Sequence, residues 1–531
     1  MDLEEPALRA IQSGDETEIS QALQEYNETL QSNPQLQQAQ RISKQELAKE
    51  IIQLFCASKL LPYAVEAVTT LRFLSRDKSV VAKHFTEKRG NELLLNLAKL
   101  NANEDYKYSE PDVELNACKC LCNVIYLSKD ATGLCKNSSF IKALVHKIGS
   151  HKKHTHNQNV INLKLIFLVS ALNPEGRKII TEQCDGRKSV LDFLNNTLES
   201  STNNEDTDHG KKFTADKTTI CCELLKVLFN LNMDLRHAKI YSENETEELN
   251  LTMEYCRTIL LSTSSIPELT EGLHCSAGNA IYSIPPVCMS IDRLLLVSKD
   301  DTAPSDIKQE IMPVMVLVDI LKEKVMNDII KTEILHPILA LLSDLCRRSS
   351  EIRRYFKDLI LPPRKDFKHR PEEGLRFRNK LIKLFTHTNT NVKEGVADFL
   401  FVLCKESVDR FVKYTGYGNA AGLLASRGLL AGGHGETVYS DADSDSDTEE
   451  YKEASTKINP VTGHIPLPVS SPMEGMTDEQ KEHLAAQLAN DISKLSSGSI
   501  IQPMGIGPDG SLVPLQQQVH DTELKEDSDS D

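Results

Sequence analysis

The sequence predicts an all-α protein, namely an armadillo/HEAT-like helical-repeat superhelix followed by a largely disordered acidic C-terminal tail with one amphipathic helix. A chain of 531 residues is too long for one compact core. Apolar residues recur at spacings of three and four through the first 430 residues, whereas the alternating pattern of strands is nearly missing. Tryptophan is absent and aromatic residues make up only 5%, which suits leucine-rich helices better than a β-sandwich.

Helical periodicity marks one segment after another along the chain. The expected helices are 46–61, 62–74, 91–100, 113–127, 140–148, 161–172, 189–198, 219–231, 247–261, 309–325, 333–346, 378–385 and 392–404. The most apolar of them return roughly every 45–60 residues, a looser rhythm than the ~40–47 residues of HEAT and armadillo repeats. A less regular unit is expected near 278–281, and polar insertions at 200–217 and 299–305. These features predict a helical solenoid over residues 1–430.

Charge is distributed unevenly along the chain. Residues 431–531 contain 20 acidic and 5 basic residues, which leaves 57 acidic and 56 basic residues in the first 430. The predicted solenoid is thus nearly neutral, without the basic surplus that a nucleic-acid partner requires. The tail divides into an acidic flexible linker at 431–476, an amphipathic helix at 477–495 and a disordered segment at 496–531.

The acidic linker contains candidate phosphorylation sites. Ser440, Ser444 and Ser446 each precede an acidic residue by three positions, the spacing that acid-directed Ser/Thr kinases prefer. A solvated acidic linker without modification is the alternative reading of the same run.

Signals of enzymatic chemistry are almost absent. The pattern G-x-G-x-x-G occurs at 505–510, but Pro503 precedes it and a polar tail follows, so the strand–turn–helix of a dinucleotide site is not expected. Cys118, Cys120 and Cys122 are expected to pack in helices, because no fourth metal ligand accompanies them. We therefore expect neither a cofactor nor a metal, and no enzyme.

The cellular compartment is predicted from the N-terminal residues, the number of cysteines and a search for long apolar stretches. The N-terminal residues include Asp2, Glu4 and Glu5 and show no apolar run typical of a signal peptide. An odd count of 13 cysteines favours reduced thiols, and no stretch predicts a transmembrane segment. We expect a cytoplasmic protein, with the cell cortex or the periphery of the plasma membrane as a further location through peripheral recruitment.

Polar residues on apolar helices mark candidate binding positions. Arg72 and Arg76 lie four apart and share one helix face. The two side chains either line a binding groove or form a solvated stripe on the surface. Asn123 and Asn230 interrupt strongly apolar helices, where asparagine is poorly favoured. Each is either a satisfied core amide or a groove residue that binds a partner's backbone.

Several motifs together resemble the synembryn family. The most specific is KYTGYGNAAGLLA at 413–425, supported by LPPR at 361–364, NPVTG at 459–463 and PMEGMT at 472–477. Upstream, LSRD at 74–77 and KCLCN at 119–123 also fit the family. The resemblance is strong from 361 to 495, patchy before it and weak in the last 25 or so residues.

The resemblance implies a function in G protein signalling. Members of this family bind G protein alpha subunits, chaperone their folding and promote GDP release by stabilising the nucleotide-free state. The groove positions that it implies are Arg72, Arg76, Asn123, Phe167, Asn230, Asn279 and Arg348. It also implies phosphorylation at Ser440 and Ser446, whereas Ser283 stands where the family often has a second asparagine. The alternative is an armadillo-type adaptor or transport-receptor-like scaffold that binds peptides without affecting nucleotide.

Overall fold

The computed structural model divides the chain into two compact units, Met1–Leu295 and Leu296–Asp531. It describes residues 3–33, 35–36, 42–57, 61–86, 88–101, 108, 110–128, 132–200, 211–238, 240–296, 307–439, 449–466, 473, 475–497, 502, 504–507 and 512–514.

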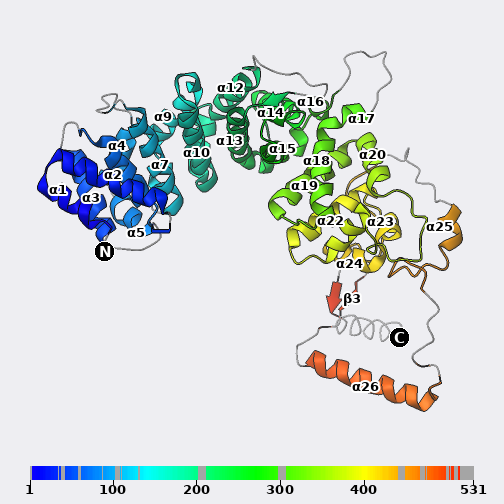
Figure 1. Cartoon of the computed structure of the whole chain (residues 1–531). Helices are drawn as coiled ribbons and strands as arrows, with labels where there is room; N and C mark the ends of the chain where they lie inside the picture. The colour runs from blue at the N-terminus through cyan, green and yellow to red at the C-terminus, as the bar shows by residue number, and fades with distance from the viewer. Residues whose placement is uncertain are drawn as a thin grey trace, which may run out of the picture. The chain divides into compact units, whose positions relative to one another are not determined.

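The first unit is built on a ladder of six helices, each packed against the next. The ladder consists of α2 (Glu16–Ser32), α4 (Ala64–Leu74), α7 (Pro111–Leu127), α10 (His156–Leu172), α13 (Ala215–Asn232) and α15 (Pro267–Tyr282). Figure 1 shows the last five of these helices following one another from blue to green. Because each ladder helix buries an apolar face against its neighbours, the row forms a continuous core.

A second row of helices covers one side of the ladder. Its members are α1 (Glu5–Ser13), α3 (Ile42–Ala57), α6 (Lys88–Leu97), α9 (Ser138–Gly149), α12 (Gly186–Glu199) and α14 (Glu243–Leu260). Each of these helices packs on a ladder helix, as α6 does on α7 and α12 on α13. The resulting helix pairs confirm the predicted armadillo/HEAT-like repeat architecture.

Shorter elements connect the two rows. They are α5 (Lys78–Val80), η2 (Val81–Phe85), α8 (Thr132–Cys135), η3 (His151–Lys153), α11 (Pro174–Lys178), η4 (Ile179–Gln183), η5 (Met233–His237), η6 (Pro286–Cys288) and α16 (Ile291–Leu294). Strands β1 (Lys212–Phe213) and β2 (Thr263–Ser264) pair in parallel. Phe213 lies inside the predicted polar insertion at 200–217, yet it is fully buried, and its carbonyl accepts from the Ser265 N–H directly after β2.

One connection occurs twice with the same geometry. The π-helices η2 and η4 each lead into an outer helix whose first turn carries a glycine, Gly90 in α6 and Gly186 in α12. A Cβ atom on Gly90 would collide with the carbonyl oxygen of His84, and one on Gly186 would lie 2.7 Å from the carbonyl oxygen of Ile180. Both sites therefore require glycine for close backbone packing.

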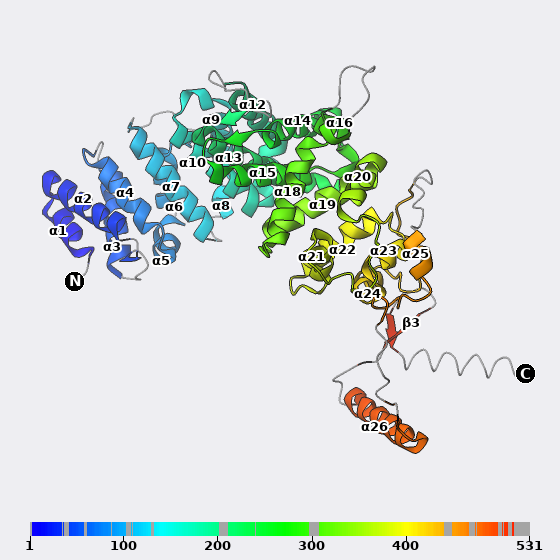
Figure 2. The ribbon, with the colours of Figure 1, turned by 45° about the vertical axis from the view of Figure 1, so that its right-hand side comes forward.

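The second unit is also helical. It contains α17 (Ile307–Glu310), α18 (Met312–Met326), α19 (Thr332–Arg348), α20 (Ser350–Ile360), α21 (Phe377–Lys383), η7 (Leu384–Thr386), α22 (Thr390–Leu403), α23 (Val408–Thr415) and α24 (Tyr417–Ser426). Helix α22 packs against α19, α20, α21 and α24, so it lies at the centre of this unit (Figure 2).

Two segments of the predicted linker at 431–476 contact the second unit. Residues 433–437 bond to the turn between α22 and α23, where Val408 N–H donates to the Gly433 carbonyl and Gly435 N–H to the Glu406 carbonyl. Helix α25 (Glu449–Ala454) leads to a turn whose Pro460 and Val461 carbonyls accept from Tyr417 and Gly418 N–H. The glycine-rich motif at 413–425 therefore serves as a docking site for the returning tail.

The remaining tail elements are α26 (Asp478–Ser497) and the antiparallel strands β3 (Met504–Ile506) and β4 (Leu512–Pro514). Helix α26 agrees with the amphipathic helix expected at 477–495. Within the described residues, no helix is both long enough and apolar enough to cross a membrane. The predicted division of the chain at residues 430, 476 and 495 stays a prediction.

Candidate functional site

Helix α4 positions the two arginines predicted to bind a partner. It buries Ala67, Val68 and Leu71, and Arg72 lies half-buried at the edge of this face, one turn after Val68. Arg76 is exposed and lies one turn later, after the helix has ended at Leu74. The guanidinium carbons of Arg72 and Arg76 lie 4.6 Å and 5.2 Å from the centre of the Phe73 ring. The two cations are therefore neighbours, as their spacing predicts.

The two asparagines occupy equivalent places in different repeats. The Asn123 Nδ2 group donates to Ser75 Oγ at 2.9 Å, and the Asn230 Nδ2 group donates to Ser170 Oγ at 3.1 Å. Asn230 also donates to the Phe167 carbonyl at 3.2 Å. In each case the amide satisfies polar groups at the C-terminal end of the preceding ladder helix. Asn230 is 4% exposed and acts as a core amide, whereas Asn123 is half-buried and also borders a hollow.

Ser283 also accepts a hydrogen bond from an asparagine at the end of a ladder helix, as Ser75 and Ser170 do. It is 1% exposed at the end of α15, donates from Oγ to the Ala280 carbonyl and accepts from Asn232 Nδ2 at 3.2 Å. Ser75 and Ser170 bond in the same way to carbonyls of their own helices. A serine at this position is thus buried in the ladder.

Four of the predicted residues line one hollow of about 480 Å³ on the ladder. These are Arg72 and Arg76 beside α4, Asn123 on α7 and Phe167 on α10. The other lining residues, which the sequence reasoning missed, are Lys119, Cys122, Ile161, Lys164, Leu168, Glu223 and Lys226. We call this site the basic hollow. It spans four consecutive ladder helices, α4, α7, α10 and α13.

Positive charge dominates the basic hollow. Five cations, Arg72, Arg76, Lys119, Lys164 and Lys226, face one carboxylate, Glu223. Burial lowers the pKa of Arg72, and the neighbouring Arg76 lowers it further. Burial also lowers the pKa of Lys119, with Arg72 as the next cause. Because like charges stand close together, the hollow is suited to an anionic ligand.

Apolar side chains share the basic hollow with these cations. Ile161 is buried, whereas Phe167 and Leu168 are half-buried and present ring and methyl groups. The Nζ atom of Lys226 lies 5.8 Å from the centre of the Phe167 ring. A helical segment with acidic and apolar side chains matches such a lining.

The spacing of residues along the helices could have predicted two of the lysines that the sequence reasoning missed. Lys119 and Asn123 are four apart on α7, and Lys226 and Asn230 are four apart on α13, so each lysine shares a face with a singled-out asparagine. Residues on the same face as a suspected groove position were therefore the best additional candidates.

Three predicted groove positions, Asn230, Asn279 and Arg348, are not among the residues that line the basic hollow. Asn279 is half-buried on α15, and its side chain makes no hydrogen bond within the described part of the chain and does not line the basic hollow. Arg348 is exposed at the end of α19, in the second unit. Their role in binding stays a prediction.

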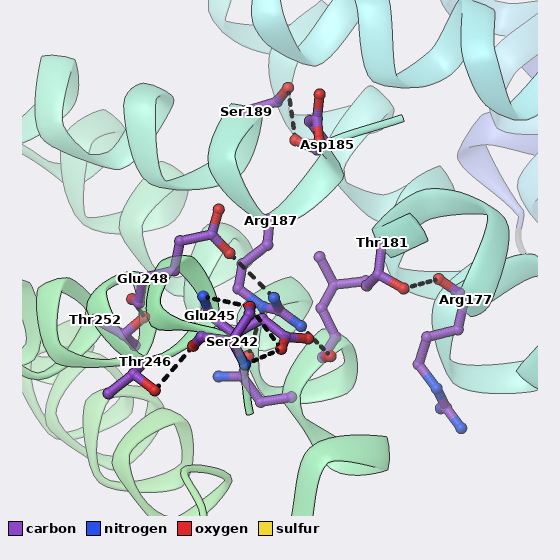
Figure 3. A network of polar contacts seen from close by, with 12 residues as sticks. Arg177, Thr181, Asp185, Arg187, Ser189, Ser242, Glu245, Thr246, Glu248 and Thr252 are labelled. Carbon is purple, nitrogen blue, oxygen red and sulfur yellow. Dashed lines mark hydrogen bonds and ion pairs between the residues drawn. The ribbon is translucent and has the colours of Figure 1, made fainter. Parts of the chain in front are cut away.

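Two buried arginines fix the ends of the ladder helices. Arg187 is 6% exposed; its guanidinium donates to Asn232 Oδ1 at 3.1 Å and the Leu231 carbonyl at 3.2 Å, and pairs with Glu248 at 3.0 Å. Figure 3 shows Arg187 pointing toward Glu248 on the neighbouring helix α14. Arg177 donates to the Ser170 carbonyl at 2.9 Å and holds Asp234 through two nitrogens. These bonds hold α10 and α13 in the positions that form the hollow.

The second unit anchors both ends of the acidic run. Before the run, the guanidinium of Arg353 lies 4.7 Å from the centre of the Tyr439 ring. After it, the Nζ atom of Lys413 lies 4.2 Å from the centre of the Tyr451 ring. The predicted phosphorylation sites Ser440 and Ser446 lie outside the described residues.

A charged network supports the first of these anchors. Glu406 is 2% exposed; one of its oxygens accepts from Arg347 at 2.9 Å and the other from the Thr437 N–H at 3.4 Å. Arg347 pairs in addition with Asp398 at 2.9 Å. The bonds to Glu406 connect the segment before the acidic run to α19.

Within the described residues, His, Cys, Asp and Glu side chains form no group that could hold a metal ion. Burial raises the pKa of the Cys118 and Cys120 thiols to about 12. Both cysteines are buried in the helix packing of α7.

Known proteins resemble this chain over nearly its full length. The family model of the guanine nucleotide exchange factor synembryn matches residues 67–511. The protein named Chaperone Ric-8A from Gallus gallus is 36% identical, with 98% of each chain covered. The protein of the same name from Xenopus laevis is 37% identical over 98% of this chain and 99% of its own.

Among solved structures, a SYS-1/POP-1 complex matches with a TM-score of 0.38 at 12% identity, covering 68% of this chain and 63% of that chain. A structure from work on the interaction between cadherin and beta-catenin matches with a TM-score of 0.31 at 10% identity, covering 81% and 96%.

Proposed function

We infer that this chain, which belongs to the synembryn family of guanine nucleotide exchange factors, binds G protein alpha subunits, chaperones their folding and promotes GDP release. The basic hollow is the observation that carries this proposal. It brings Arg72, Arg76, Asn123 and Phe167 together from three consecutive ladder helices, although more than 90 residues separate the first from the last. An anionic, partly apolar helical segment at the end of an alpha subunit is the ligand that we propose for it.

Exchange follows from differential binding and needs no bond-making residue. If the chain binds the nucleotide-free alpha subunit more tightly than the loaded one, it favours GDP release. By linkage, bound nucleotide then weakens the grip on the alpha subunit by the same factor, so GTP releases the complex. Tighter binding to the nucleotide-free state also stabilises a nascent alpha subunit that has not yet bound nucleotide.

The experiment measures GDP release from a purified alpha subunit. The double variant Arg72→Glu, Arg76→Glu reverses two of the five positive charges in the hollow. We expect at least a tenfold loss in the rate of release, since charge pairs at interfaces contribute ~1.5 kcal/mol or more. Circular dichroism should show an unchanged helix content, because Arg76 is exposed and Arg72 half-buried.

The matched control reverses two cations far from the hollow lining. Arg9→Glu with Lys88→Glu changes side chains that are 75% and 89% exposed on α1 and α6, and release should stay at the wild-type rate. Equal loss in both double variants would point to a non-specific charge effect and contradict the role of the hollow. Wild-type protein that binds the alpha subunit but leaves GDP release unchanged would favour the adaptor alternative.

We also propose that phosphorylation of Ser440 and Ser446 by an acid-directed kinase regulates this activity. The acidic run leaves the second unit beside Arg353 and returns beside Lys413, so cations stand at both ends of it. Each phosphate adds about −1.5 to −2 charges and would draw the run onto these helices.

The test compares kinase-treated wild type with Ser440→Ala, Ser446→Ala. We expect faster GDP release from the phosphorylated wild type and no acceleration in the double variant, whereas Ser444→Ala should behave as wild type. Equal acceleration in all three proteins would reject the assignment of these two serines. The proposal places the protein in the cytoplasm, with recruitment to the membrane periphery through its partner, which cell fractionation checks.

A further inference from the structure

Among the described residues, Glu223 is the one carboxylate in the lining of the basic hollow. It lies on α13, three residues before Lys226, and is 7% exposed. Its Oε1 atom accepts from Lys226 Nζ at 2.7 Å. Its Oε2 atom is buried and has no hydrogen-bond partner among the described residues. A buried carboxylate oxygen without a donor is rare in native proteins, so this atom requires an explanation.

A second unpartnered atom belongs to another residue of the same lining. Arg72 Nη1 donates to Asn116 Oδ1 at 3.0 Å, whereas Arg72 Nε is buried and has no acceptor among the described residues. Two residues that line the same hollow therefore carry one unsatisfied donor and one unsatisfied acceptor. A ligand that supplies an acceptor to Arg72 and a donor to Glu223 would satisfy both.

The charges around Glu223 restrict what kind of donor fits. Lys226 already neutralises the carboxylate, and Lys119, Lys164 and Arg72 line the same hollow. A ligand ammonium or guanidinium group would meet this excess of positive charge and be repelled. A neutral donor, such as a side-chain amide or a hydroxyl, meets no such penalty.

We propose that Glu223 is a specificity-determining residue, whose Oε2 atom accepts a hydrogen bond from a neutral side-chain donor of the bound segment. Arg72 Nε donates to an acceptor of the same segment. The preferred partner is an alpha subunit whose C-terminal segment combines acidic residues with an amide or hydroxyl side chain. This inference rests on the proposed function for the identity of the ligand.

The experiment uses the full chain and fluorescent peptides that carry the C-terminal sequence of an alpha subunit. Each amide or hydroxyl residue of the peptide is replaced in turn by a non-donor of similar shape, as in Gln→Met, Asn→Leu, Ser→Ala or Tyr→Phe. We expect one replacement to weaken binding to the wild type by about tenfold or more, the usual effect of losing a hydrogen bond to a charged group.

Two variants of the protein assign that effect to Glu223. Glu223→Met removes the acceptor, so the sensitive and the substituted peptide should bind it equally. Glu223→Gln keeps a side-chain carbonyl and should retain part of the discrimination, which also guards against a Met variant that fails to fold. Glu175→Met, at an exposed glutamate on α11, is the matched control and should discriminate as the wild type does.

The outcomes separate this inference from the proposed function. If the peptide binds the wild type and Arg72→Glu, Arg76→Glu abolishes binding, but no donor replacement matters, only the role of Glu223 is overturned. Discrimination that persists in a folded Glu223→Met variant overturns it as well. If no alpha-subunit peptide binds the wild type, the proposed ligand is wrong, and the inference fails with it.

Discussion

At the scale of single residues, Arg187 on α12 links three helices of the first unit. Its three bonds reach the end of α13 through the Leu231 carbonyl and Asn232, and α14 through Glu248. Arginine suits this place because its planar group directs several donors at once, whereas the lysine ammonium is a point charge. The position of α13 in the basic hollow depends on this link.

We predict that Arg187→Met lowers the free energy of unfolding of the first unit by about 2–4 kcal/mol, because it leaves buried acceptors without a donor. Urea unfolding followed by hydrogen exchange in α12, α13 and α14 measures the change. Arg187→Lys should recover less than half of the loss. Arg9→Met, on the exposed face of α1, should unfold as the wild type does. An unchanged exchange rate in α13 of Arg187→Met would contradict the role assigned to this side chain.

Residue roles could be predicted only in part. The arginine pair was correctly grouped because its members are four apart and no tertiary information is needed. The choice between core amide and groove residue for Asn230 could not be made from the sequence. It depends on Ser170 and Phe167, which lie some 60 residues away and meet Asn230 only after α10 packs on α13.

At the scale of elements, most of the long repeat helices were predicted, but α2 and α20 were missed although their buried apolar residues recur at spacings of three and four. Helix α7 was expected at 113–127 and forms at Pro111–Leu127, since its apolar residues recur over four turns. Helix α15 was expected only as a less regular unit near 278–281, because Gly272, Ser276 and Gly278 lower its helical propensity. Packing against α13 and α14 overrides that weakness. The π-helices were not predictable, because they depend on the close approach of a later glycine.

Two glycines in helices should respond to alanine in opposite directions. Gly90→Ala places a Cβ atom against the His84 carbonyl in a tight backbone contact and should destabilise the first unit by about 1–3 kcal/mol. Gly272→Ala, within α15, places its Cβ where no atom lies within 4 Å, and should stabilise the unit by about 0.5–1 kcal/mol. Thermal unfolding of both variants checks the signs. Stabilisation by Gly90→Ala would show that the π-helix connection does not require glycine.

At the scale of the whole molecule, the net charge does not show where charged side chains gather. The first 430 residues are nearly neutral, with 57 acidic and 56 basic residues, so the sequence indicated no electrostatic steering. The fold nevertheless gathers five cations and one carboxylate at one hollow. Summed composition could not predict this, because the cations come from four helices spread over more than 150 residues. Local charge, and not the total, should therefore set the rate of partner association.

The gathering of cations in the basic hollow predicts how the rate of partner association depends on salt concentration. The association rate of an acidic alpha-subunit peptide with the wild type should fall steeply between about 0.05 M and about 0.5 M NaCl, because screening shortens the reach of the hollow's field from roughly 14 Å to roughly 4 Å. In Lys119→Met with Lys164→Met, the rate at low salt should drop and its salt dependence should flatten, while dissociation changes less. Stopped-flow fluorescence measures both rates, and Arg9→Met with Lys88→Met provides a control of equal net charge. If the control flattens the salt dependence as much as the hollow variant does, net charge rather than the basic hollow governs the encounter.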